Sequence, residues 1–159
     1  MNRLPKVLFL STGNSTRSQM AEGFLRNLAG DRFIAASAGI EPGSLNPIAA
    51  EVMKEAGIDI SGQHAKDVKS SLKEHFGYVI TVSDDAKERA PIFPFTLHLL
   101  HWNIMDPSAA KGSNEEIKNA FRRVRDQVDS KVRDFLSERS LELESVSADA
   151  KPAARTATG

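Results

Sequence analysis

Short apolar runs and longer amphipathic segments alternate along the chain. The apolar runs predict strands over residues 6–11, 33–37, 78–82 and 96–101. Apolar positions three and four residues apart, bounded by capping residues, glycine or proline, predict helices over residues 18–29, 47–56, 66–76 and 84–88. Because strands alternate with helices, we expect an α/β fold: a three-layer sandwich whose four-stranded sheet is mainly parallel and carries helices on both faces.

The longest helical pattern lies in the last third of the chain. Its apolar positions recur at spacings of three and four and form one stripe over about five turns. They are Ile117, Phe121, Val124, Val128, Val132 and Phe135. The residues from about 144 onward contain no aromatic side chain. We therefore predict a folded domain over residues 1–140 and a disordered tail over residues 141–159.

Composition narrows the class of protein. The chain has 159 residues with 21 basic and 21 acidic side chains, and this balance argues against general nucleic-acid binding. Its longest uninterrupted apolar run, residues 7–10, is too short for a membrane helix or a signal peptide, so we expect no membrane association and a cytoplasmic location. It has no cysteine, which excludes disulfides, thiolate metal sites and thiol catalysis.

A polar loop joins the first strand to the first helix. Its sequence is Ser11-Thr12-Gly13-Asn14-Ser15-Thr16-Arg17-Ser18. Gly13 and Asn14 tolerate positive φ, so successive N–H groups can turn inward toward an anion, and the following helix directs its positive end to the same place. Arg17 adds a planar fork for two oxygens. The alternative left open by this short pattern is a Ser/Thr-rich turn with a surface arginine.

Residues 8–23, LFLSTGNSTRSQMAEG, resemble the phosphate loop of the low-molecular-weight protein tyrosine phosphatase superfamily, and above all that of its thioredoxin-coupled arsenate reductases. The family loop reads cysteine, five residues, arginine, serine, and Ser11 stands at the cysteine position here. The similarity continues through residues 37–39, 46–47, 58–61, 81–86, 91, 101–102 and 106–107. It spans about residues 6 to 139, and we expect an arsenate reductase domain over 1–140.

The resemblance assigns roles to the loop and to one aspartate. A thiolate at position 11 would attack arsenate or phosphate, and Arg17 and the amides of residues 12–16 would hold its oxygens. Ser18 would hydrogen-bond the thiolate and lower its pKa. Asp106, before Pro107, matches the general acid, for which a raised pKa is expected. The alternative for Asp106 is a turn-capping residue.

The resemblance also implies a redox relay and an ion. Reductases of this type carry two further cysteines, which pass the disulfide on for thioredoxin to reduce. Ser83 and Ala90 stand at those positions here, and the short helix between them would have to loosen for a disulfide to form. Where the phosphatases usually have a tyrosine, this chain has Ser108, which favours the reductase branch. The residues matching a potassium site in some reductases are Asn14, Glu22, Ser37 and Asp67, although Glu22 also suits an ordinary helix face.

The missing sulfurs define the functional hypothesis. A serine hydroxyl without an activating base is a poor nucleophile at neutral pH, so we predict that the chain binds phosphate or arsenate without turning it over. It would be either a cysteine-free variant of an active reductase, which the intact Asp106 favours, or a natural oxyanion-binding pseudoenzyme. The enzymatic alternative for the parent activity is the hydrolysis of tyrosyl phosphate.

Overall fold

A four-stranded parallel sheet forms the centre of the molecule. The computed structural model describes the backbone of residues 3–158 and the side chains of residues 3–140. The strands are β1 (Lys6–Ser11), β2 (Ile34–Gly39), β3 (Tyr78–Thr81) and β4 (His98–His101), in the spatial order β2-β1-β3-β4. All three neighbouring pairs are parallel, which confirms the predicted sheet. β2 extends two residues beyond the predicted strand because Gly39 still pairs with Ser11.

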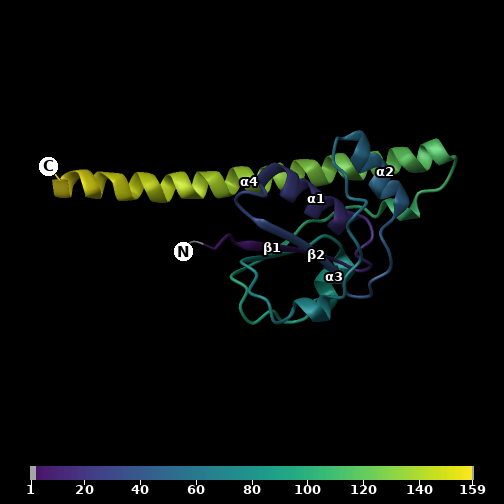
Figure 1. Ribbon diagram of the computed structural model, residues 1–159, viewed down its shortest axis with the longest axis horizontal. Coiled ribbons are helices and arrows are strands. Elements are labelled where there is room, and N and C mark those ends of the chain that lie inside the picture. Colours follow the sequence, from purple (N-terminus) through teal and green to yellow (C-terminus); the bar gives the residue numbers. More distant parts are fainter. Residues whose placement is uncertain (1–2, 159) are drawn as a thin grey trace.

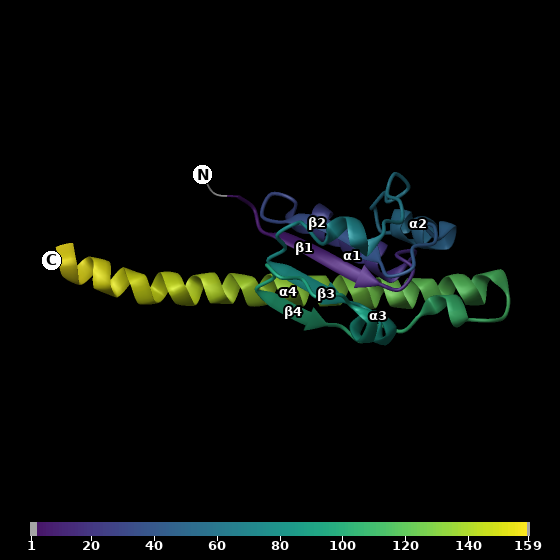
Figure 2. The same cartoon turned by 90° about the horizontal axis from the view of Figure 1, so that it is seen from below.

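Helices cover both faces of this sheet, as predicted. α1 (Arg17–Ala29), α2 (Pro47–Glu55) and α4 (Asn114–Thr158) lie on one side (Figures 1 and 2). On the other side are α3 (Asp84–Arg89) and the 3₁₀ helix η1 (Val68–Ser71), and a second 3₁₀ turn, η2 (Pro107–Ala109), precedes α4. Of the helices that the structure describes, none has an apolar stretch long enough to cross a membrane.

The alternation of side chains along β1 separates two apolar cores. Val7 and Phe9 pack with the residues of α1, α2 and α4, whereas Leu8 and Leu10 pack with Val68 of η1 and the apolar residues around α3. These four apolar side chains of β1 are fully buried. β1 is therefore held from both faces, and the loop that follows it starts from a fixed point.

α4 carries the predicted apolar stripe and extends beyond the sheet. Phe121, Val124, Val128, Val132 and Phe135 are buried against α1, α2 and the sheet. The helix continues to Thr158, through the segment for which the sequence predicts a disordered tail (Figure 1). Alanine, leucine and glutamate in this segment favour helix locally. The side chains of residues 141–159 lie outside the described ones, and the domain boundary at residue 140 stays a prediction.

Two predicted helices differ from the structure. The helix predicted over residues 66–76 is wrong, because only the 3₁₀ turn of η1 forms there. Asp67 accepts the N–H of Lys69, and the hydroxyl of Ser70 donates to the carbonyl of Asp67, so local side-chain contacts replace helical ones. α1 begins at Arg17 rather than at a capping Ser18, because the Ser18 hydroxyl faces the loop instead.

We expect Phe121→Ala to lower the free energy of unfolding by about 3–5 kcal/mol, since Phe121 is 1% exposed where α4 packs on α1 and the sheet. Asp134→Ala, an exposed position on the same helix, is the control and should stay within about 0.5 kcal/mol of the parent. Urea unfolding followed by circular dichroism measures both. Equal stability of the two variants would contradict the role given to α4.

Candidate functional site

The loop between β1 and α1 turns its carbonyl groups outward. Six consecutive carbonyls, from Ser11 to Thr16, each accept a hydrogen bond from the surrounding chain. The donors are the backbone N–H groups of Met20, Ile40, Glu41, Gly43 and Asn46 and the side-chain amide of Gln19. In a planar trans peptide the carbonyl and the next N–H point in opposite directions. The N–H groups of residues 12–17 are therefore directed to the concave side of the loop.

Asn14 makes this course of the backbone possible. Its φ is 51°, in the left-handed region that asparagine tolerates better than most residues. Its N–H donates to Ser11 Oγ at 2.9 Å, and its side-chain amide donates to Ser18 Oγ at 2.9 Å. The predicted positive φ is thus present at Asn14, whereas Gly13 has none.

Ser11 lies at the floor of the loop, where the resemblance places a nucleophile. The residue is 3% exposed, and its hydroxyl lies 2.7 Å from that of Ser18. The contacts of the Ser11 hydroxyl are a backbone N–H and a second hydroxyl, and neither group removes a proton at neutral pH. Among the residues whose side chains the structure describes, those that contact the Ser11 hydroxyl hold it in place, and none of them is a base that could activate it.

Arg17 is the cationic side chain in the lining of the pocket above the loop. One guanidinium nitrogen donates to the carbonyl of Ile104 at 2.9 Å, and another lies 3.8 Å from Asp106 Oδ2. Burial lowers the pKa of Arg17, and the charges of Asp106 and Asp84 act against that shift. Arginine stays charged in proteins, so the guanidinium of Arg17 is a permanent cation in the pocket. Ile104 and Asp106, which lie just before and at the start of η2, hold it in place.

Asp106 is ionised at neutral pH and caps η2. Its carboxylate accepts the N–H and the hydroxyl of Ser108 at 2.9 and 2.7 Å. Burial raises the pKa of Asp106, but these hydrogen bonds and the charge of Arg17 outweigh burial and leave the pKa below its ordinary value. The raised pKa expected of a general acid is therefore wrong for the protein alone, because the capping contacts favour the ionised form. A bound dianion would act in the opposite direction.

The two positions of the expected redox pair lie at opposite ends of α3. Ser83 is the N-cap of the helix, where it accepts the N–H of Ala86, and its hydroxyl is 3.4 Å from that of Thr12 in the loop. Ala90 ends the helix and lines a different pocket beside β4. The structure therefore brings Ser83 to the loop and leaves Ala90 one short helix away.

Two aspartates that sequence reasoning missed complete the pocket. Asp84 and Asp85 directly follow Ser83 and line the same cavity of about 490 Å³ as the loop and Asp106. Thr12 donates to Asp85 at 2.8 Å, which lowers the pKa of that carboxyl, and Asp84 pairs with His101. Their position after β3, beside the carboxyl end of β1, is the signal that could have identified them.

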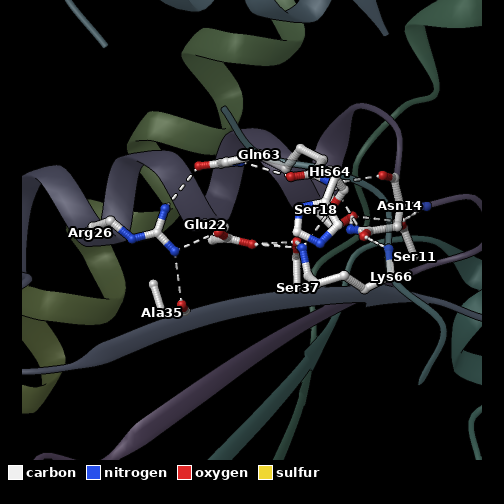
Figure 3. A network of polar contacts seen from close by, with 11 residues as sticks. Ser11, Asn14, Ser18, Glu22, Arg26, Ala35, Ser37, Gln63, His64 and Lys66 are labelled. Atoms are coloured by element: carbon white, nitrogen blue, oxygen red, sulfur yellow. Dashed lines mark hydrogen bonds and ion pairs between the residues drawn. The ribbon is translucent and has the colours of Figure 1, made fainter. Parts of the chain in front are cut away.

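The four residues matched to a potassium ion do not form an ion site. Asp67 caps η1, and Asn14 Oδ1 accepts the backbone N–H of Lys66 at 2.8 Å. Ser37 donates to Glu22 at 2.6 Å, and the ammonium of Lys66 lies 3.5 Å from both side chains (Figure 3). A potassium ion at Glu22 and Ser37 would meet this ammonium, so these residues do not fit the ion.

The chain is similar to proteins of one known family. Residues 6–149 match the family described as low molecular weight phosphotyrosine protein phosphatase. The arsenate reductase of Bacillus subtilis (strain 168) is 42% identical over 129 residues, which are 81% of this chain and 93% of the relative. The arsenate reductase of Shouchella clausii is 40% identical over the same shares of the two chains.

Solved structures of arsenate reductases have folds similar to that of this chain. A structure described as an arsenate reductase in the phosphate binding state superposes with a TM-score of 0.71 at 30% identity, over 85% of this chain and 98% of the other. A thioredoxin-dependent arsenate reductase of Corynebacterium glutamicum has a TM-score of 0.71 at 25% identity, over 89% of this chain and 64% of the other. A tyrosine phosphatase of Erwinia amylovora, at 20% identity and a TM-score of 0.67 over 86% and 93%, shares the fold.

We expect Gly39→Ala to disturb the loop, because an added Cβ would lie 2.9 Å from Thr12 O and 3.0 Å from Asn14 N. The expected cost is about 1–3 kcal/mol of unfolding free energy. Gly43→Ala is the matched control, since no heavy atom lies within 4 Å of its added Cβ. Urea unfolding compares the two. If Gly39→Ala is as stable as Gly43→Ala, the close approach of β2 to the loop does not require a glycine at position 39.

Proposed function

We propose that this chain, which belongs to the low molecular weight phosphotyrosine protein phosphatase family, binds a tetrahedral oxyanion in its loop and does not turn it over by thiol chemistry. The observation that carries the proposal is the run of six outward carbonyls, which directs the N–H groups of residues 12–17 to the concave side of the loop. Arg17 and the N-terminus of α1 add positive charge at that point.

Phosphate and arsenate are the anions that suit this arrangement. Both are tetrahedral and carry similar charge, so convergent N–H donors hold either one equally well. A neighbouring solved structure is described as an arsenate reductase in the phosphate binding state, which supports phosphate as the first anion to test. Asp84, Asp85 and Asp106 repel a second negative charge, and this favours a small anion deep in the loop over an extended anionic ligand.

Arsenate reduction is the parent activity that the relatives favour. With thiols at 11, 83 and 90, the thiolate at 11 would attack arsenate, form an arsenic–sulfur bond and expel an oxygen as water. The thiolate at 83 would then attack that sulfur, so that arsenite leaves with the electron pair of the broken bond. The thiol at 90 would attack the sulfur at 83 and leave a disulfide between 83 and 90 for thioredoxin to reduce. The contact of Ser83 with Thr12 supports the second of these steps.

Ser11, Ser83 and Ala90 replace all three sulfurs in this chain. A hydroxyl at position 11 lacks a base among its contacts, and an alanine at position 90 has no reactive atom at all. The groups that hold the anion remain, which is the pattern of a protein that binds without catalysis. A cysteine-free variant of a reductase and a natural oxyanion-binding protein both have this pattern.

Arg17→Lys should weaken the binding of inorganic phosphate by about tenfold or more, because an ammonium lacks the planar fork that contacts two oxygens and the contact to Ile104 together. Arg133→Lys, an exposed position on α4, is the control and should bind like the parent chain. Isothermal titration calorimetry measures all three proteins. No heat of binding in the parent chain, or equal affinity for Arg17→Lys, would contradict the site.

Restoring the sulfurs should restore the parent chemistry. We expect the triple variant Ser11→Cys, Ser83→Cys, Ala90→Cys to release arsenite repeatedly when thioredoxin, thioredoxin reductase and NADPH are supplied. The double variant without Ala90→Cys is the matched control and should stop after about one equivalent, with a disulfide between 11 and 83. Arsenate reduction by the unsubstituted chain would overturn the proposal. Hydrolysis of an aryl phosphate without arsenate reduction in the triple variant would favour the phosphatase alternative.

A further inference from the structure

A lysine ammonium lies behind the loop, on the far side from the oxyanion pocket. Lys66 Nζ donates to the carbonyl of His64 at 2.8 Å and lies 3.5 Å from Glu22 Oε1 and 3.5 Å from Ser37 Oγ. The Glu22 side chain is only 6% exposed, and that of Lys66 is 30% exposed. The cationic end of Lys66 therefore sits among a carboxylate, a hydroxyl and a carbonyl oxygen, which are the ligand types that hard metal cations take (Figure 3).

The same residue is tied to the loop through its backbone. The N–H of Lys66 donates to Asn14 Oδ1 at 2.8 Å, and the carbonyl of Lys66 accepts the N–H of Gly39 at 2.8 Å. Asn14 in turn contacts Ser11 and Ser18. Lys66 thus contacts Glu22 through its ammonium and the anion loop through its backbone.

Glu22 already has two cationic partners. Arg26 pairs with one carboxylate oxygen from the next turn of α1 and also donates to the carbonyl of Ala35, while Lys66 approaches the other oxygen. The cluster of Glu22, Arg26 and Lys66 therefore has a net charge of +1. A third cation at Glu22 would meet electrostatic repulsion from both of them.

We propose that the ammonium of Lys66 takes the place of the potassium ion that the family resemblance implies, so that this chain holds its loop without an alkali cation. Lys66 is a positioning residue, because it contacts the loop through Asn14, is held by Glu22 and does not line the anion pocket. The inference rests on the proposed oxyanion site only for its effect on phosphate affinity. Its effect on stability is independent of that site.

Thermal unfolding in potassium chloride and in N-methylglucamine chloride, at equal ionic strength, tests the proposal. The parent chain should have the same Tm in both salts. Lys66→Met keeps the backbone contacts but leaves Glu22 and Ser37 without the ammonium, so its Tm should fall by roughly 5 °C in the organic salt and recover in part with potassium. Lys73→Met, at an exposed lysine after η1, is the control and should resemble the parent chain in both salts.

Phosphate calorimetry in the same two salts gives the second measurement. The parent chain should bind equally well in both, and Lys66→Met should bind several times more weakly without potassium than with it. A potassium-dependent rise in the Tm of the parent chain would overturn the proposal, as would a Lys66→Met variant that potassium does not stabilise. If Lys66→Met does not fold, the two-salt comparison on the parent chain decides alone. If the parent chain binds no phosphate in either salt, the proposed function is wrong. The melting curves still test whether Lys66 replaces the potassium ion.

Discussion

The direction in which six peptide groups face is the constraint on which the site depends. Each carbonyl from Ser11 to Thr16 is held by a donor outside the loop, from α1 or from the segment that follows β2. These contacts leave the N–H groups no other direction than the concave side. The positive φ of Asn14 is tolerated because its N–H and its side chain are both bound. The concave face of the loop is therefore formed by contacts within the protein, so binding an anion there would cost little further loop ordering.

A buried polar face on α1 supports this cup. Ser18, Gln19 and Glu22 are all at most 4% exposed, although they lie on a helix that also packs against the apolar core. Buried polar groups are costly unless they are hydrogen-bonded, and here each one has partners: Ser18 meets the loop, Gln19 meets the loop and His64, and Glu22 meets Arg26, Ser37 and Lys66. The network stiffens the loop and links it to the segment before η1.

The sequence predicted what local patterns determine. The strands, the length of α1 and the position of its loop follow from apolar runs and polar segments within a few positions of one another. The polar face of α1 could not be predicted, because its partners lie up to 45 residues away. The helix predicted over 66–76 failed because Asp67 and Ser70 bond their own backbone. The lowered pKa of Asp106 depends on Ser108, two residues away, and also on the charge of Arg17, which only the fold brings near.

Under the proposed function, the chain keeps the loop that would hold an anion and lacks the thiols that would react with it. Nuclear magnetic resonance of the unsubstituted protein during a titration with inorganic phosphate tests most directly whether the chain binds an anion without converting it. Saturable shifts concentrated in the amides of residues 11–18, with phosphate unchanged at the end, are the predicted result. Amides in that segment that do not respond to saturating phosphate would contradict the account, because the inward N–H groups would then hold no anion.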